Sequence, residues 1–462
     1  MSVYCVDCGS NVLSNVKIRG AEVALSFGIG NVSLQNVKIS SSVTALSLPS
    51  MASLQMTNCR FYDNQYVVNA RDASHVNVSS CVFERNQYGI RLRQVQLLDF
   101  VDTQFSGSSD NLRVWSSSSR TVLIIKRSKF VDGSVYMNTI TNAAYIEDCL
   151  FTSGRLDINY LTVLLIKGSR FVDSSVNVAY YNANISASVE DCDFNSSTLV
   201  VSAHYRTNIW STIANSTFHS SRVRVSILVV PHSLRLSIVG CSFRRMVSQT
   251  VVELNAPSLQ AVVIADNIFQ ENSRASCITV NVQAVSSDVI PGSINIVGNS
   301  FTNHSGANVI VINDRAYHHV QLRRNVFQNP LCLFEIEVQS LWRSGYTINS
   351  SENWWGSTNH TYIAERVSDV FVDSTKAKVS ITSVYSDPEM TQLEALLDPR
   401  TWNVNDRNVA GGELDRNVTL TGSNIPYLVN KTIYIPKGFQ LHLKDNATLH
   451  FAEKRGIIVE GM

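Results

Sequence analysis

The chain has 462 residues, of which 44% are hydrophobic and 16% are charged, and its net charge is +1. This composition excludes an intrinsically disordered chain, and the small net charge supplies no overall field that would attract nucleic acid or an acidic membrane surface. The longest apolar runs, at 161–166 and 227–230, are too short to cross a bilayer and are interpreted as buried strands.

A short pattern of apolar residues returns along most of the chain. Two alternating apolar residues, such as Val76 and Val78, precede a two-residue break, a small residue at Cys81 and a large one at Phe83. A recurrence of this size indicates a solenoid, and the period-two alternation favours strands over helical or leucine-rich repeats. The closing large residues lie 20 to 32 positions apart, at Ile18, Ile39, Phe61, Phe83, Phe105, Phe130, Phe151, Phe171, Phe194, Phe218, Phe243, Phe269, Phe301, Phe327 and Trp355.

The break inside each copy predicts a sharp corner. If Val76 and Val78 point inward, strict alternation would turn Ser80 inward and Cys81 outward, so an inward Cys81 needs a corner at this point. The residue before the small position is Asn, Asp or Gly in eleven of fourteen copies, and these types tolerate left-handed backbone. Short strands joined by corners, with no helix between them, predict an all-β, right-handed parallel β-helix of about 15 rungs, a rung being one turn of the coil.

The small position of each copy predicts a ladder of inward side chains. Two rungs separate Cys149 from Cys192, about 10 Å by strand spacing, which is too far for a disulfide. We therefore expect mostly free, buried thiols, with only Cys59 and Cys81 on adjacent rungs, and asparagines that satisfy one another's amide groups. The ladder positions occupied by Cys or Asn are Cys59, Cys81, Cys149, Cys192, Cys241, Asn267, Asn299, Asn325 and Asn353.

The remaining cysteines and the histidines give no metal or cofactor site. Cys5 and Cys8 form an isolated CxxC motif without a second pair at zinc spacing, so we expect neither a metal nor a cofactor. The disulfide state of these two residues, and of Cys277 and Cys332, is left open. His318 and His319 form an adjacent pair that we interpret as a surface strand end.

The regular pattern ends near residue 350, and three regions are predicted. Residues 1–356 form the β-helix, 357–412 a capping helix and linker, and 413–462 the opening rungs of a second, truncated β-helix. Ile363, Val367 and Val370 have helical spacing, which predicts a short amphipathic helix over 358–373. We interpret the chain as a piece of a larger protein.

The chain contains eleven sequons for N-glycosylation. Their number modestly exceeds what composition alone would give, so a glycosylated extracellular chain is favoured over an Asn- and Ser-rich solenoid that forms sequons by chance. The acceptor residues are Asn31, Asn77, Asn184, Asn195, Asn215, Asn303, Asn349, Asn359, Asn417, Asn430 and Asn446.

The region from 350 to 462 resembles a known family in several short motifs. These are NWWG at 353–356, Ile363, Glu365-Arg366-Val367, Asp369, Pro426-Tyr427-Leu428-Val429, Ile433-Tyr434-Ile435-Pro436 and Gly456-Ile457-Ile458-Val459. They are similar to the joins between β-helix units in the bark beetle proteins, animal membrane proteins of tricellular septate junctions. Membership implies an ectodomain of several β-helix units on the extracellular side of the plasma membrane, and it implies no catalytic residues. Similar NWWG joins occur in bacterial surface β-helices.

An enzyme is the rival class, because the same fold carries polysaccharide lyases and hydrolases. Glycoside hydrolysis needs two carboxylates about 5 to 9.5 Å apart, which on a β-helix means acids in one outward column of adjacent rungs. Two positions past each Phe, Asp63, Asp132 and Asp173 are interrupted by Arg85 and Gly107, so the acids skip rungs. We therefore expect no catalytic residues.

Two interpretations of Trp354 and Trp355 are open: a platform on which sugars stack, or packing of the helix against the last rung. We favour packing. Together these observations predict a non-catalytic scaffold or adhesion segment at cell junctions. Its partners would be other cell-surface proteins and glycans rather than nucleic acid, and the alternatives are a polysaccharide-acting enzyme or a carbohydrate-binding surface protein.

Overall fold

The computed structural model describes residues 3–460 apart from the segments 6–9, 29, 49–52, 116–120, 181–184, 204–207, 228–232, 248, 258, 275, 284–291, 307, 397–399, 405–407, 423–425 and 445. The chain divides into two units, Met1–Ser237 and Ile238–Met462. The strand β26 (Ser233–Val239) spans the division. The predicted boundaries at 356 and 412, which separate the β-helix, the linker and the second β-helix, stay predictions.

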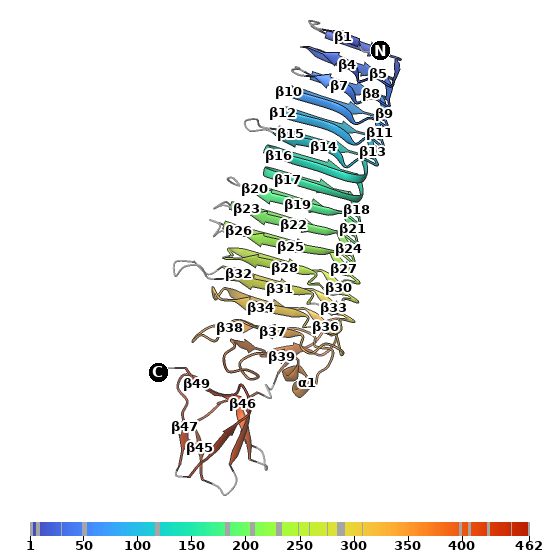
Figure 1. Cartoon of the computed structure of the whole chain (residues 1–462). Helices are drawn as coiled ribbons and strands as arrows, with labels where there is room; N and C mark the ends of the chain where they lie inside the picture. Colours follow the sequence, from blue (N-terminus) through green and yellow to red (C-terminus); the bar gives the residue numbers. More distant parts are fainter. Residues whose placement is uncertain are drawn as a thin grey trace. The chain divides into compact units, whose positions relative to one another are not determined.

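Unit 1 is a coil of short parallel strands stacked rung upon rung, and its strands form three parallel sheets, called A, B and C (Figure 1). Sheet A contains β1 (Val3–Cys5), β4 (Val23–Phe27), β7 (Thr44–Leu48), β10 (Tyr66–Ser79), β12 (Tyr88–Val101), β14 (Asp110–Trp115), β16 (Lys129–Glu147), β17 (Leu150–Lys167), β19 (Ser175–Tyr180), β22 (Thr198–Ala203) and β25 (Arg222–Ile227). Sheet B adds β2 (Ser10–Ser14), β5 (Asn31–Gln35), β8 (Ser53–Thr57), β15 (Thr121–Lys126), β20 (Ile185–Glu190) and β23 (Asn208–Ala214). Sheet C adds β3 (Lys17–Arg19), β6 (Lys38–Ser40), β9 (Arg60–Tyr62), β11 (Val82–Glu84), β13 (Gln104–Ser106), β18 (Arg170–Val172), β21 (Asp193–Asn195) and β24 (Thr217–His219). The long strands continue around a corner and belong to more than one sheet.

The closing phenylalanines stack on one another inside unit 1. From Phe61 to Phe218, neighbouring ring centroids lie 4.4 to 5.2 Å apart. Phe151 pairs in register with Phe171 at 5.0 Å, and both rings are buried, as predicted. Because each rung contributes one large residue at the same point, the stack fixes the register of every strand.

Left-handed residues form two corners on most rungs. All fourteen positions before the small residue have positive φ, including Ser80 (51°), Arg127 (46°) and Arg324 (53°), which confirms the predicted corner. Two residues after the Phe lies a second such corner, for example at Asp63 (56°) and Asp173 (48°). The acids two positions after the Phe, Asp63, Asp132 and Asp173, are therefore corner residues.

The inward ladder is confirmed and is held by hydrogen bonds. In unit 1 the backbone N–H of one ladder residue donates to the side chain of the next, as Cys149 N does to Ser169 Oγ (3.1 Å) and Cys192 N to Ser216 Oγ (3.1 Å). The ladder cysteines are buried thiols and not disulfides.

Unit 2 has the same three-sheet pattern and its own stack of rings, from Phe243 through Phe269, Phe301 and Phe327 to Trp355. Sheet A contains β28 (Val252–Ala256), β31 (Ile278–Val282), β34 (Ile310–Asp314), β37 (Ile336–Val338) and β39 (Val367–Ser368). Sheet B contains β29 (Ala261–Ala265), β32 (Ser293–Val297), β35 (His319–Arg323), β38 (Thr347–Asn349) and β40 (Lys378–Ser380). Sheet C contains β27 (Ser242–Arg244), β30 (Ile268–Gln270), β33 (Ser300–Thr302) and β36 (Val326–Gln328).

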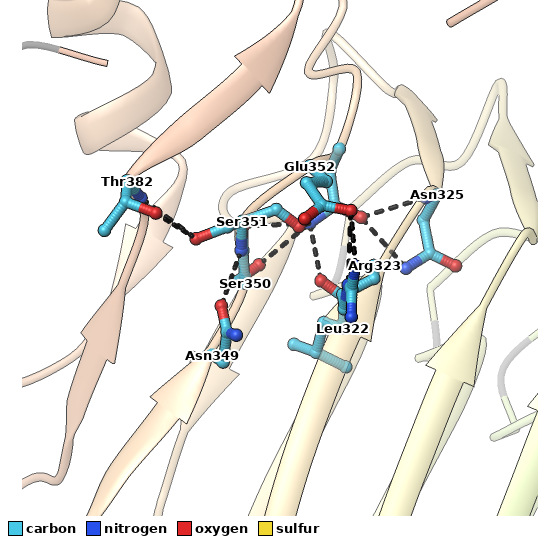
Figure 2. A network of polar contacts seen from close by, with 9 residues as sticks. Leu322, Arg323, Asn325, Asn349, Ser350, Ser351, Glu352 and Thr382 are labelled. Atoms are coloured by element: carbon cyan, nitrogen blue, oxygen red, sulfur yellow. Dashed lines mark hydrogen bonds and ion pairs between the residues drawn. The ribbon is translucent and has the colours of Figure 1, made fainter. Parts of the chain in front are cut away.

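The ladder of unit 2 begins at Cys241, whose backbone N–H donates to Asn267 Oδ1, and continues as asparagines. Each side-chain amide donates to the next carbonyl, from Asn267 to Asn299 (2.9 Å), from Asn299 to Asn325 (3.1 Å) and from Asn325 to Asn353 (3.0 Å). Figure 2 shows the end of this ladder, where Arg323 forms an ion pair with Glu352 at 2.7 Å. The buried amides of this ladder therefore satisfy one another, as predicted.

The C-terminal part of unit 2 differs from the prediction in its helix. The helix α1 (His360–Glu365) is capped by the Asn359 side chain and ends well before residue 373. Val367 lies in β39, which pairs with β37, because the chain returns to the coil at this point and edge pairing overrides the helical spacing.

Parallel strand pairs also form between residues 409 and 459, as expected for the start of a second β-helix. β44 (Val409–Glu413) pairs with β46 (Tyr427–Ile435), which pairs with β48 (Leu449–Phe451) and β49 (Ile457–Val459), and β45 (Val418–Leu420) pairs with β47 (Leu441–Leu443). Two antiparallel pairs precede it, β41 (Ser383–Tyr385) with β42 (Leu393–Ala395), and β43 (Asn403–Val404) with β44. Within the described part of the chain, no helix is both long and apolar enough to cross a membrane.

Candidate functional site

The outward side chains of sheet A in unit 1 carry an unusual charge. We call the outward positions that β10, β12, β14, β16, β17, β19, β22 and β25 contribute to sheet A the arginine face. Its residues are Tyr66, Asn69, Arg71, Tyr88, Arg91, Arg93, Asp110, Arg113, Trp115, Ser134, Tyr136, Asn138, Arg155, Asp157, Asn159, Ser175, Asn177, Ala179, Thr198, Val200, Ser202, Arg222, Arg224 and Ser226. Seven arginines and two aspartates give it an excess of five positive charges, whereas the whole chain has a net charge of +1.

The register aligns these side chains in columns that cross the strands. In one column Arg91 pairs with Arg113, Arg113 with Tyr136, Tyr136 with Asp157, and Asp157 with Asn177. Successive members lie about 4.8 Å apart, the spacing of neighbouring strands. Residues that are about 20 to 25 positions apart in the sequence therefore form one continuous surface.

Arg91 is held in place by its neighbours. Its guanidinium carbon lies 3.5 Å from the ring centroid of Tyr88 and 5.3 Å from that of Tyr66, and these two rings stack on each other at 4.9 Å. Its Nη2 donates to Asp110 Oδ2 at 3.2 Å, and only 19% of its side chain is exposed. Cation–π and charged hydrogen-bond contacts thus orient the guanidinium before any ligand arrives.

Arg113 and Arg155 are fixed in a similar way but are more exposed. Arg113 donates to Asp110 Oδ2 at 3.3 Å and lies 5.4 Å from the ring of Trp115. Arg155 donates from Nε to Asp157 at 2.5 Å, and 62% of its side chain is exposed. Asp157 is itself buried. Both arginines therefore have anchored guanidinium groups with surface left for a ligand.

A groove of about 520 Å³ borders this face at the start of its strands. Glycine is required in its wall, because a Cβ atom at Gly133 would lie 2.0 Å from the carbonyl oxygen of Ser108, and one at Gly154 would lie 2.6 Å from that of Gly133. Asp173 and Arg155 also line the groove, and Ser134, Arg155 and Ser175 belong to both surfaces. The groove further contains six serines, Ser109, Ser134, Ser153, Ser174, Ser175 and Ser196.

The sequon asparagines occupy other parts of the surface. Asn195 and Asn349 are half-buried, and Asn184 lies outside the described residues. None of the eleven asparagines belongs to the arginine face, so a glycan on any of them would be attached outside this face. The exposed acceptors are Asn31, Asn77, Asn215, Asn303, Asn359, Asn417, Asn430 and Asn446.

Two ladder cysteines, Cys149 and Cys192, are buried structural thiols. Burial raises the pKa of Cys149 and Cys192 to about 12, so the thiolate that reacts is scarce at neutral pH. Cys8 lies outside the described residues. Among the residues that the structure describes, no three His, Cys, Asp or Glu side chains are grouped so that they would hold a metal ion.

The interpretation of His318 as a surface residue is wrong. Its ring is buried, with Nδ1 at 2.8 Å from Asp314 Oδ1 and Nε2 at 3.1 Å from the carbonyl oxygen of Leu259. Only His319 of the pair is exposed. The carboxylate four residues earlier in the sequence is the signal for this burial, because a buried imidazole needs such a partner.

Trp355 is fully buried and lies 5.1 Å from Phe327, at the end of the ring stack. Its burial excludes a sugar platform at Trp355, and the packing of the helix against the last rung stays a prediction.

Comparison with known proteins supports the fold. Residues 2–155 match a family model described as "Right handed beta helix region". No curated protein matches this sequence. Among solved structures, the chain is similar to a mutant of the PL6 family alginate lyase AlyGC, with 9% identity, 97% of each chain covered and a TM-score of 0.20, a score that supports no argument about function. The family match and the parallel pairing confirm the predicted right-handed parallel β-helix.

Proposed function

We propose that this chain is a non-catalytic β-helical scaffold that binds carbohydrate through unit 1. The observation that carries the proposal is the serine-lined groove, which shares residues with a face of anchored arginines. Hydroxyl groups donate and accept hydrogen bonds, as sugar hydroxyls do, and anchored polar groups lose little entropy on binding.

The test is binding of the secreted 462-residue chain to immobilised polysaccharides. Ser175→Tyr places a large ring in the groove and is expected to reduce binding at least tenfold. The control is Thr212→Tyr, a substitution at an exposed position of β23 in sheet B, which is expected to leave binding unchanged. Equal binding by both variants, with unchanged melting temperatures, would place the carbohydrate site elsewhere.

The cellular setting belongs to the same proposal. The resemblance to the bark beetle proteins and the eleven sequons support an ectodomain at cell junctions, where the coil would hold binding modules at a fixed spacing and raise their effective concentration. Mass spectrometry of the secreted chain tests the extracellular part. Glycans at several exposed sequons are expected, and a chain without any glycan would contradict it.

An enzyme acting on polysaccharides is the second candidate. Asp110 and Asp157 lie two strands apart and two residues apart along the strand direction on the arginine face, which makes about 12 Å and exceeds the separation used by inverting glycosidases. Both carboxylates are paired with arginines, and this pairing favours a structural role. Turnover of a polysaccharide that Asp157→Asn abolishes would establish the enzyme instead.

A further inference from the structure

We infer that the ligand of the arginine face is a linear acidic polysaccharide that lies across the strands of sheet A, with its carboxylate or sulfate groups on the arginines. This inference rests on the proposed function and adds the chemistry and direction of the ligand.

The charge of the face determines the chemistry of the ligand. Seven arginines and two aspartates give the face an excess of five positive charges. An arginine guanidinium presents several donors in a fixed plane that match a carboxylate or a sulfate group. A neutral sugar would use the serine hydroxyls of the groove but would not neutralise this excess charge.

The arrangement of the charges determines the direction of the ligand. Arg91 and Arg113 are neighbours in one column, Arg155 is paired with Ser134 and Ser175, and Arg224 pairs with Val200. The column from β12 to β25 crosses six strand spacings, about 29 Å. One strand offers only three outward positions on this face, so an extended polymer reaches several arginines only by crossing the strands.

The aromatic residues argue against a nucleic acid ligand. Proteins that bind single strands offer open ring faces on which bases stack. Here Tyr66 and Tyr88 stack on each other at 4.9 Å, and Arg91 lies 3.5 Å from the ring centroid of Tyr88. These rings therefore serve to orient the arginine, and they leave little ring surface for a base.

The experiment compares two double variants of the full chain that remove the same charge. Arg91→Gln with Arg113→Gln removes two arginines of the face, each paired with Asp110. The matched control is Arg85→Gln with Arg127→Gln, which removes two corner arginines that are paired with Asp63 and Asp102. Binding is measured by calorimetry, at two salt concentrations, to polygalacturonate, heparin, neutral amylose and polyuridylate.

The expected result is binding to polygalacturonate or heparin that weakens with salt. The face variant is expected to lower the affinity about tenfold or more, and the corner variant to leave it within about twofold. A preference between the two acidic polymers tells carboxylate from sulfate recognition. Shortened oligosaccharides are expected to lose affinity once they no longer reach from Arg91 to Arg224.

Three results would overturn the inference. Salt-independent binding of amylose with equal affinity for both variants would refute the acidic ligand while leaving the proposed carbohydrate function in place. Tighter binding of polyuridylate would identify a nucleic acid site. Failure to bind any of the polysaccharides would refute the proposed function together with this inference.

Discussion

Sheet A presents very different outward faces in the two units. In unit 1 it carries seven arginines and two aspartates, whereas in unit 2 its outward positions on β28, β31, β34 and β37 include the half-buried Glu253, Asn255, Asn281 and Glu337 and contain no arginine. The interiors are alike, since both units stack one large ring per rung at about the strand spacing. Inward positions are constrained by stacking, so the outward positions are where the units can differ in function.

The largest effect is expected from the shared interior. Phe171→Ala removes a buried ring from the middle of the unit 1 stack and is expected to cost about 3 to 5 kcal/mol of unfolding free energy. Trp210→Ala, at a position that is 40% exposed, is the control and should cost about 0.5 kcal/mol or less. Chemical denaturation measures both, and a cost under about 1 kcal/mol for Phe171→Ala would contradict the stack.

The ladders of the two units are expected to differ in sensitivity. Asn299→Ala in unit 2 leaves both the backbone N–H and the amide of Asn267 without their acceptor, so we expect a loss of about 2 kcal/mol or more. In unit 1, Cys192→Ser keeps a small side chain that donates a hydrogen bond, as the Cys192 thiol does to the carbonyl oxygen of Glu190, and a smaller loss is expected. Equal losses would show that the asparagine ladder has no special role.

The corner ion pairs should show the smallest effect. The Arg127 side chain donates hydrogen bonds to Asp102 and lowers the pKa of that exposed carboxyl. A lowered folded-state pKa adds stability that is complete above the unfolded pKa and is lost as the pH falls through the folded value. Arg127→Gln should therefore be slightly less stable at neutral pH, and its difference from the native chain should vanish in acid. A difference that grew in acid would contradict this.

The interior was predictable from the sequence because stacking imposes one type of residue at each inward position. Phe151 and Phe171 show this for the rings, and Asn58 and Asp148 show it for the corners. The helix was predicted too long because Val367 and Val370 have helical spacing, yet pairing of β39 with β37 decides the conformation of Val367.

The arginine face was not found from the sequence because its columns do not keep one offset from the phenylalanines. Arg91 and Arg113 each follow a Phe by eight residues, whereas Tyr136 and Asp157 follow by six, since the second corner is shorter in these rungs. A search at a fixed offset therefore misses the alignment that the strand register creates. Aligning the rungs on both corners would have brought Arg91, Arg113 and Tyr136 into one column.

We propose that ligand binding belongs to the outward face of unit 1 and not to unit 2. Hydrogen–deuterium exchange of the full chain, with and without polygalacturonate, tests it most directly. We predict slower exchange in and around β12 to β19, including the corners beside Gly133 and Gly154, and no change over β28 to β37. Protection confined to β28 to β37 would contradict the account.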